Sequence, residues 1–314
     1  MRALQITDGS LELAELPEPS PGPGEVLVDV TAAGVNRADV AQTAGKYPPP
    51  PGASDLPGLE VSGHRRDTGD AVVALLAGGG YAEVVAVPEQ QLLPAPHNLD
   101  LLDAAGVIEV TATVVSNLVI EAGLRAGETV LIHGGTGGIG TTAIQLASAL
   151  GARVLTTAGS DAAAAQLREL GADHAWNRHT TDLPGEVEAL GGADVILDVI
   201  GGSALGSNVS MLREHGRLVI IGTLGGASGE LPIGQLMGKR ARVIGTTLRS
   251  RAPQAKGEIL ERTRELVWPL LADGTLRIPI HARLPLERGN DAHAILREGG
   301  HLGKVILEVS SEGP

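Results

Sequence analysis

The chain has 314 residues, with 24 Lys and Arg against 37 Asp and Glu, and a formal net charge of -13. This length allows two domains with buried cores, and the acidic balance argues against nucleic acid or an anionic membrane as the main partner. Cys and Phe are absent, which excludes disulfides, thiol nucleophiles and cysteine-ligated zinc. No segment has the apolar character of a signal peptide or of a membrane span, so we expect a soluble, cytoplasmic protein.

Residues 1 to about 95 have the pattern of strands and loops. Glu25–Val30 alternates between polar and apolar residues, as a half-buried strand does, and Ala82–Val87 is a second strand candidate. Proline clusters at Pro17–Pro23 and Pro48–Pro51 mark turns or ordered loops. The core here has to be built from Val, Ile, Leu and Ala.

From Thr129 onward, short apolar strands alternate with helical segments. The expected strands are 130–132, 153–157, 174–176, 195–198, 218–221 and 243–245, and the expected helices follow the glycine turn or lie near 162–170, 186 and 204–213. This alternation predicts a doubly wound parallel sheet of the Rossmann type. Beyond Lys256 we expect a helix over Gly257–Leu271, a turn, and a last strand over Lys304–Val309.

A glycine-rich turn follows the strand Val130–Ile132 and opens a helical pattern. Gly134, Gly137 and Gly140 form GxxGxxG, and Gly135 with the last two forms GxGxxG. Such a turn lets backbone N–H groups and a helix N-terminus face a pyrophosphate. The expected dinucleotide contacts are therefore Gly134, Gly135, Thr136, Gly137, Gly138, Ile139 and Gly140.

The end of the second strand of this region favours NADP over NAD. An NAD site has an Asp or Glu there to hold the ribose hydroxyls. This chain reads Thr156–Ser160 with Gly159 before the serine, and the first acid is Asp161. The Ser160 hydroxyl can donate to a 2′-phosphate instead.

Several motifs resemble the zinc-free quinone oxidoreductases (zeta-crystallin-like) among the medium-chain reductases, and above all their p53-inducible quinone reductase branch. The resemblance spans nearly the whole chain. Its most specific part is the block Ala32–Gly63, with Asn-Arg-Ala-Asp and Tyr-Pro-Pro-Pro-Pro-Gly, and further motifs are Ala74–Pro88, GTTLRSR and VWPLLADG.

The resemblance implies a Rossmann NADP-binding domain plus a β-rich GroES-like catalytic domain formed by both chain ends, with NADPH held in a cleft. The implied ranges are 1–105 and 251–314 for the catalytic domain and 106–250 for the Rossmann domain. Two departures of this chain from the family pattern concern the stability of the catalytic domain and the cleft for the substrate. The stretch between Gly63 and Gly69 is shorter than in relatives, which could open the catalytic domain, and Ile108–Val119 resembles a cleft-lining helix without its usual aromatics.

The same resemblance assigns further cofactor contacts. Arg178 stands where relatives have a Tyr near the 2′-phosphate, and it could supply the charge of a missing Lys; the alternative is a solvated loop arginine. Gly222, after the fifth strand, could let the backbone approach the nicotinamide half, or it could be an ordinary loop glycine.

The chemistry suggested by these residues is metal-free hydride transfer. Without cysteine or an HExxH spacing a zinc route is closed, and we expect His64 to be a surface histidine. Acceptors that are already electrophilic, quinones or conjugated carbonyls, need little more than a hydrogen bond or a proton for the product oxyanion. No metal site is therefore expected.

Tyr47 and Asn36 are the candidate catalytic residues. The resemblance places Tyr47 over the nicotinamide as a proton donor, and the alternative is packing. Asn36 could bond the nicotinamide ribose or the substrate oxygen, so it is a candidate cofactor contact as well, or it could cap the helix that begins at Arg37. Arg249 and Arg251 could edge the cleft or be surface charges.

Three functions stay open: a quinone oxidoreductase, an enone, alkenal or enoyl reductase, and a weakly active NADPH-binding, crystallin-like protein. Relatives are usually homodimers or homotetramers that pair sheet edges, which implies an interface at Val243–Gly245.

Overall fold

The computed structural model describes residues 1–309 and has a mixed α/β fold with two compact units. The first, here called the end unit, comprises Met1–Ala112, Leu248–Gly274 and the residues from Ile278 on. The second, the middle unit, comprises Thr113–Thr247 and Thr275–Arg277. Both chain termini therefore belong to one unit.

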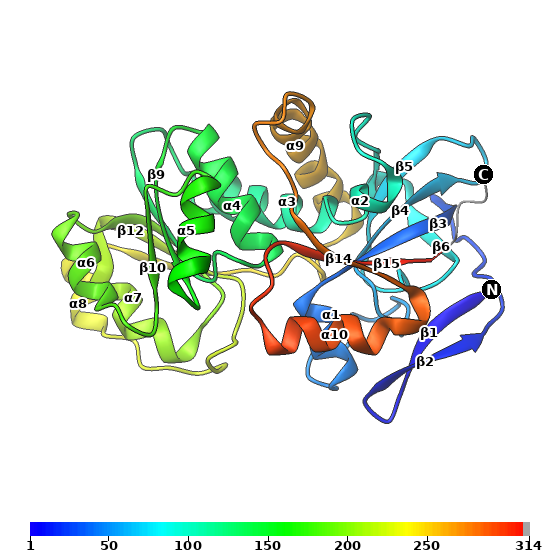
Figure 1. The fold of residues 1–314 in the computed structure, drawn as a ribbon, viewed down its shortest axis with the longest axis horizontal. Helices are drawn as coiled ribbons and strands as arrows, with labels where there is room; N and C mark the ends of the chain where they lie inside the picture. Colours follow the sequence, from blue (N-terminus) through cyan, green and yellow to red (C-terminus); the bar gives the residue numbers. More distant parts are fainter. Residues whose placement is uncertain (310–314) are drawn as a thin grey trace. The chain divides into compact units, whose positions relative to one another are not determined.

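The middle unit is built on a six-stranded parallel sheet with the order β10-β9-β8-β11-β12-β13 (Figure 1). This is the doubly wound Rossmann order, in which the chain starts in the middle of the sheet and returns to it before building the second half. The strands are β8 (Thr129–Ile132), β9 (Arg153–Ala158), β10 (His174–Asn177), β11 (Ala193–Asp198), β12 (Leu212–Ile220) and β13 (Arg242–Gly245).

The helices of the middle unit alternate with these strands, because the apolar side of each helix is buried against a face of the sheet. They are η2 (Val115–Glu121, a π-helix), α4 (Gly138–Ala149), α5 (Asp161–Glu169), α6 (Leu183–Ala189), η3 (Gly202–Ala204), α7 (Leu205–Met211) and α8 (Ile233–Gly238). Helix α7 ends two residues before the expected Arg213. Leu212 already belongs to β12, where it pairs with Ala193.

The end unit contains a seven-stranded, mainly antiparallel sheet and a separate two-stranded ribbon. The strand order of the seven-stranded sheet is β14-β15-β3-β4-β5-β7, with β6 paired to β3. The two-stranded ribbon consists of β1 and β2. The strands are β1 (Arg2–Thr7), β2 (Ser10–Glu15), β3 (Glu25–Val35), β4 (Glu60–Arg65), β5 (Ala71–Leu75), β6 (Val84–Pro88), β7 (Leu92–Pro94), β14 (Ile280–Pro285) and β15 (Lys304–Glu308). The last strand, β15, pairs with β3, which joins the two chain ends in one sheet.

The helices of the end unit are short except for one. They are α1 (Arg37–Thr43), η1 (Glu89–Gln91), α2 (Leu101–Ala104), α3 (Ile108–Val114), α9 (Pro253–Ala272), η4 (Leu286–Arg288) and α10 (Gly289–Glu298), and α3 continues into the middle unit. Helix α9 begins earlier than the expected Gly257, because Pro253 is well suited to the first turn. The run Leu101–Glu121 is long and apolar enough to cross a membrane, but 78% of its most apolar window is buried.

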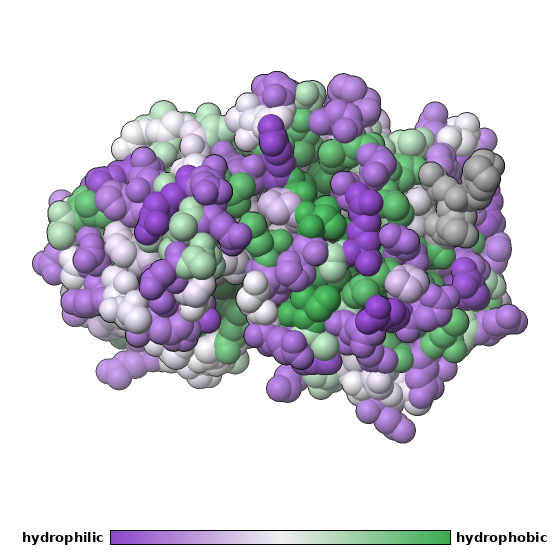
Figure 2. Space-filling model, viewed as in Figure 1, coloured by the Kyte–Doolittle hydropathy of each residue, from purple (hydrophilic) through white to green (hydrophobic). Residues whose placement is uncertain are grey.

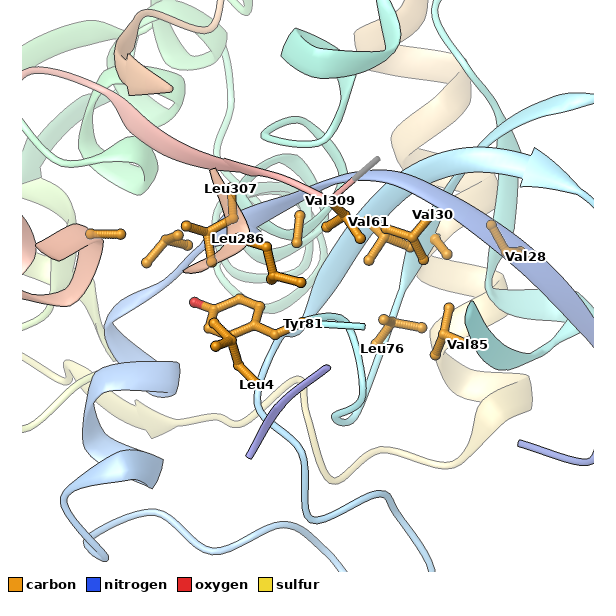
Figure 3. Packing of buried hydrophobic residues seen from close by; sticks show 14 of the residues in the cluster. Leu4, Val28, Val30, Val61, Leu76, Tyr81, Val85, Leu286, Leu307 and Val309 are labelled. Atoms are coloured by element: carbon orange, nitrogen blue, oxygen red, sulfur yellow. The ribbon is translucent and has the colours of Figure 1, made fainter. Parts of the chain in front are cut away.

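The main core cluster of the end unit is aliphatic apart from the phenol ring of Tyr81. Figure 3 shows Tyr81 beside Leu4 and Leu286, with Val30, Val61 and Val85 further along the same cluster. Tyr81 has no exposed surface, and its hydroxyl is hydrogen-bonded. A phenol can be buried in this way because its polar end has partners. Branched aliphatic side chains supply the rest of the packing, as a chain without Phe requires.

The unit boundaries differ from the expected ranges by a few residues. The first transition falls after Ala112 rather than at 105, and the second after Thr247 rather than at 250. Ile108 and Ala112 pack in one cluster with Val73 and Leu260 of the end unit, which explains the first shift.

The shortened stretch between Gly63 and Gly69 closes a regular hairpin. Strands β4 and β5 pair from Glu60–Leu75 to His64–Ala71, and Arg65 N–H donates to Asp70 O at 2.9 Å. The loss of length therefore leaves the sheet continuous. Figure 2 shows a face on which polar residues surround smaller groups of apolar ones, in keeping with the charge of the chain.

Candidate functional site

The glycine turn joins β8 to α4 at the carboxyl edge of the parallel sheet. Gly134 has a φ of +71°, and Gly135 N–H donates to Thr157 O at 2.9 Å, which ties the turn to β9. Thr141 N–H bonds Gly137 O and opens the hydrogen-bonding of α4. The first-turn N–H groups of a helix have no intrahelical acceptor, so they are available to an anion. The expected contacts 134–140 thus lie together in one turn.

The turn has no room for side chains at two of its glycines. A Cβ on Gly140 would lie 2.6 Å from Gly135 Cα, and one on Gly135 would meet Leu167 and Thr156. Gly137 differs, because the nearest atom to its Cβ would be Gly134 O at 3.9 Å. Gly135 and Gly140 are therefore required by packing, whereas the space above Gly137 is open. An open space at a helix N-terminus fits the pyrophosphate of a dinucleotide.

Ser160 and Arg178 lie at the ends of the neighbouring strands β9 and β10. Ser160 Oγ accepts from Ala163 N–H at 3.2 Å and so caps α5, which leaves the hydroxyl hydrogen to donate. The Arg178 guanidinium lies against Gly159, since a Cβ there would be 3.3 Å from Nη1. Arg178 is exposed, and within residues 1–309 its guanidinium has no hydrogen-bond or ion-pair partner. This exposed position fits the alternative of a solvated loop arginine, and the contact of Arg178 with a 2′-phosphate stays a prediction.

A pocket of about 340 Å³ opens beside Arg178 in the middle unit. Its lining includes Thr157, Ser203 and the buried His133. His133 Nε2 lies 2.7 Å from Asn208 Oδ1, and burial lowers the pKa of His133, so the ring is neutral at pH 7. Arg178 and Asp182 place one charge of each sign in the lining, and the other lining residues are neutral. A pocket of this kind, with an unpaired guanidinium, suits a nucleoside with a phosphate.

Gly222 follows β12, and its position has a packing reason. A Cβ on Gly222 would lie 2.9 Å from Val199 O. The glycine thus allows two loops of the middle unit to approach each other. Its expected contact with the nicotinamide half is not tested by this packing.

Asn36 lies in the end unit, just before α1, and its side-chain amide is held from both ends. Lys304 Nζ donates to Asn36 Oδ1 at 2.7 Å, and Asn36 Nδ2 donates to Glu60 Oε1 at 2.9 Å. Lys304 also donates to Glu60 Oε1 at 2.7 Å and to Val35 O at 3.0 Å. Asn36 is the N-cap residue by position, but the cap bond comes from the side chain of Asp39, which accepts from Asn36 N–H at 2.8 Å.

Tyr47 lies in the proline-rich loop after α1 and is half-buried. Burial raises the pKa of its phenol, Arg249 lowers it and Glu109 raises it. Among the described residues nothing accepts from or donates to the Tyr47 hydroxyl. The phenol is therefore protonated at pH 7 and its hydrogen is available to a ligand.

Arg249 is not a surface charge, because it is 5% exposed. It donates to three groups of the end unit: Ala77 O, Tyr47 O and Gln42 Oε1. Arg251 is half-buried and His64 is exposed, the latter as expected.

Two buried polar groups were missed by reasoning from the sequence alone. Lys304 and Glu60 form an ion pair with 2% and 0% of their side chains exposed. Near them, Tyr81 OH lies 3.1 Å from Asp39 Oδ2 and 3.2 Å from His293 Nε2. A lysine inside the expected last strand, at a position that should be apolar, was the available signal.

The residues around Asn36 do not resemble a metal centre. No group of three or more His, Asp or Glu that could hold a metal occurs in the part of the chain that the structure describes. Glu60 begins β4, and Lys304 places a positive charge beside Asn36. A cation next to the candidate position disfavours a second cation.

Comparison with known proteins agrees with this architecture. The alcohol dehydrogenase GroES-like domain model matches residues 22–97, and the zinc-binding dehydrogenase model matches residues 138–265. The fold and the glycine turn thus define a medium-chain dehydrogenase/reductase.

The relatives narrow this class. The quinone oxidoreductase of Mus musculus is 30% identical over 98% of this chain and 97% of its own length. The quinone oxidoreductase structure from Thermus thermophilus, solved also with NADPH, is 33% identical over 98% of this chain and 100% of its own, with a TM-score of 0.83. A structure named as an NAD-dependent alcohol dehydrogenase is 30% identical over 99% and 100%, with a TM-score of 0.84. The chain belongs to the quinone oxidoreductase family, and it is an oxidoreductase with a nicotinamide cofactor.

Proposed function

We propose that the protein is an NADPH-dependent quinone oxidoreductase that transfers hydride without a metal. The observation that carries the cofactor preference is the guanidinium of Arg178, which lies against Gly159 beside Ser160 and has no hydrogen-bond or ion-pair partner among residues 1–309. An unpaired guanidinium favours a phosphate, with which it can form two parallel hydrogen bonds. The end of β9 offers no carboxylate for the ribose hydroxyls of NAD.

The cofactor, when bound, supplies the hydride from C4 of its nicotinamide. The residues of the middle unit bind and orient it: the first turn of α4 faces the pyrophosphate, and Ser160 and Arg178 face the 2′-phosphate. In the end unit, Tyr47 offers a phenol hydrogen to the oxygen that gains charge on the acceptor. Asn36, held by Lys304 and Glu60, presents a rigid amide edge to the nicotinamide ribose or the acceptor.

The experiment that tests the cofactor is a binding titration with NADPH and NADH, followed by intrinsic Trp fluorescence or by calorimetry. We expect tighter binding of NADPH by a factor of ten or more, about 1.4 kcal/mol or more. Equal affinity for the two cofactors would contradict the proposal. The two cofactors have to be compared for this chain, because one similar structure is named as an NAD-dependent alcohol dehydrogenase.

The acceptor is tested separately from the cofactor. NADPH oxidation is followed with a panel of 1,4-quinones, 2-alkenals and cyclic enones at equal concentrations. We expect higher kcat/KM for the quinones. Quinone rates at background together with turnover of the alkenals or enones would favour the enone reductase, and tight binding of NADPH with no turnover would favour the crystallin-like protein.

We also propose that two copies of the chain associate through the edge strand β13. Within residues 1–309, β13 pairs with β12 on one side and with no strand on the other. Helix α8, which precedes it, has no buried residue, and Leu224, Ile233 and Met237 are 62%, 61% and 71% exposed. An unpaired edge beside exposed apolar side chains is what a two-fold sheet extension covers. Two such dimers together form the homotetramer that is the second expected assembly.

A further inference from the structure

Arg249 connects three segments of the end unit that are far apart in the sequence. It lies between β13 and α9 and is nearly fully buried. Its Nε donates to Ala77 O at 2.8 Å, its Nη1 to Tyr47 O at 3.1 Å, and its Nη2 to Gln42 Oε1 at 2.7 Å. A planar guanidinium holds such partners in one fixed geometry, which an ammonium cannot do.

The loop that Arg249 reaches has few hydrogen bonds of its own. It runs from residue 44 to residue 57, and Pro48–Pro51 in its middle have no N–H to donate. Gln42 Nε2 donates to Asp55 O at 2.8 Å near the far end of the loop. Arg249 therefore holds Tyr47 directly and reaches Asp55 through Gln42. Backbone hydrogen bonds such as Lys46 N–H to Ala41 O and Gly79 N–H to Leu56 O fix the two ends of the loop, and Arg249 adds contacts between them.

The same guanidinium also lies near the Tyr47 ring. Arg249 Cζ is 5.1 Å from the ring centroid, within the range of a cation–π contact. The groups that act on the phenol are its own burial, which raises the pKa, Arg249, which lowers it, and Glu109, which raises it. Arg249 thus contacts Tyr47 through its backbone and through its ring.

We propose that Arg249 is a positioning residue, whose guanidinium holds the Tyr47 loop and the Tyr47 ring in the arrangement that the reaction uses. Arg249 acts through Tyr47 and Gln42, and its fork is committed to the protein rather than to a substrate. This inference rests on the proposed role of Tyr47 for its catalytic meaning. The contacts themselves can be tested without any substrate or cofactor.

The test compares Arg249→Gln and Arg249→Lys with the wild type. The matched control is Arg264→Gln, because Arg264 is an exposed arginine of α9 without a described partner. The first readout is limited digestion with trypsin, since exposed Lys46 precedes Tyr47 and cleavage between them reports opening of the loop. The fragment that begins at Tyr47 is identified by its mass. Denaturant unfolding of each variant measures global stability.

The second readout is the ultraviolet absorbance of the tyrosine phenolate during a pH titration. The chain has two tyrosines, and the pKa of Tyr81 is raised well above its ordinary value by burial. The first phenolate to form is therefore that of Tyr47, and Tyr47→Phe confirms the assignment by removing it. Loss of the Arg249 charge should raise the pKa of Tyr47.

We expect Arg249→Gln to speed cleavage at Lys46 by about tenfold or more, because local opening then costs less. We also expect a higher pKa for Tyr47, and an intermediate effect for Arg249→Lys, which keeps the charge without the fork. Cleavage equal to that of Arg264→Gln, or an unchanged Tyr47 titration, would overturn the proposal. If Arg249→Gln does not fold, Gln42→Leu is used in the cleavage assay, and unaltered cleavage there has the same meaning.

Activity is measured last, with NADPH and the best quinone. A lower kcat with an unchanged affinity for NADPH is expected for Arg249→Gln. If the protein proves to lack quinone reductase activity, the two substrate-free readouts still decide whether Arg249 holds the loop. Failure of the proposed function and failure of the positioning role are thereby distinguished.

Discussion

Lys304 Nζ lies 2.7 Å from Glu60 Oε1, in an ion pair whose side chains are 2% and 0% exposed. Both charges have further partners: Val35 O and Asn36 Oδ1 for the ammonium, and Glu109 N–H, at 2.9 Å, for the other carboxylate oxygen. A buried pair is tolerated when its remaining hydrogen-bonding capacity is used in this way. The pair connects β15 to β4 and orients Asn36 between them.

Removal of one charge of this pair should be more harmful than removal of both. We expect Lys304→Met to lower the free energy of unfolding by about 3–5 kcal/mol, because Glu60 is left charged and buried. The double variant Lys304→Met with Glu60→Leu should recover part of this loss. Urea unfolding measures both, and the exposed pair of Arg262 with Glu265 on α9 provides the control, since Arg262→Ala should cost less than about 1 kcal/mol. A double variant less stable than the single one would refute the reasoning.

Arg178→Gln should weaken NADPH binding without affecting NADH. A charge-assisted hydrogen bond contributes about 1.5–3 kcal/mol, which corresponds to roughly a tenfold to hundredfold rise in Kd. The Kd for NADH should stay within about twofold, because NADH has no 2′-phosphate. Arg125→Gln, an exposed arginine of the same unit, is the control. Parallel losses for the two cofactors would place Arg178 elsewhere than at the 2′-phosphate.

The glycines of the turn should respond differently to alanine. Gly140→Ala places a methyl group against the Gly135 backbone and should lower stability by about 1–3 kcal/mol. Gly137 has a φ of -70° and open space, so Gly137→Ala should lower stability by no more than about 1 kcal/mol, the loss expected for Ala at an N-cap, while it weakens dinucleotide binding. Thermal unfolding and NADPH titration of the two variants separate packing from ligand contact. Full NADPH affinity in Gly137→Ala would argue against a pyrophosphate at that position.

Asp39 and His293, joined through Tyr81, should have opposite effects on stability as the pH falls. Burial raises the pKa of Asp39 to about 6, so its native state prefers the protonated form, and stability increases as the pH falls from about 6 to 3.8. Burial lowers the pKa of His293 to about 4, so stability is lost as the pH falls from 6.5 to about 4. Each of these pKa shifts changes the free energy of unfolding by about 3 kcal/mol at most.

The wild type should therefore show a nearly flat contribution from these two groups between about pH 4 and pH 6.5. Asp39→Asn should expose the His293 effect, with stability falling over this range on acidification. His293→Gln should show the opposite slope. Urea unfolding at several pH values measures both, and equal slopes in the two variants would contradict the assignment.

The assembly proposal predicts that one charge on α8 dissociates the dimer. Met237→Glu introduces a carboxylate at a side chain that is 71% exposed in the single chain, so it should leave the fold intact. Leu13→Glu is the control, because Leu13 is exposed at 43% on the separate ribbon of β1 and β2. Light scattering reports the mass of each variant. A Met237→Glu protein with the mass of the wild type would exclude this interface.

The class of fold could be predicted from local patterns. The prediction of a Rossmann unit used the strand and helix periods and the spacing of Gly134, Gly137 and Gly140. The prediction of the cofactor used the missing acid before Asp161. All of these are properties of neighbouring residues. The absence of cysteine likewise needs no structure to exclude a cysteine-ligated zinc.

Long-range contacts were decided only by the tertiary structure. Lys304 reaches Asn36 across 268 positions of the chain, and Arg249 reaches Tyr47 across 202. The roles of these cations depend on burial and on which partners the sheet brings close, and no local period encodes either. The sequence therefore determined the architecture and the glycine turn between β8 and α4. The folded chain determined which polar groups are paired inside it and that, among residues 1–309, the Arg178 guanidinium and the Tyr47 hydroxyl have no hydrogen-bond partner.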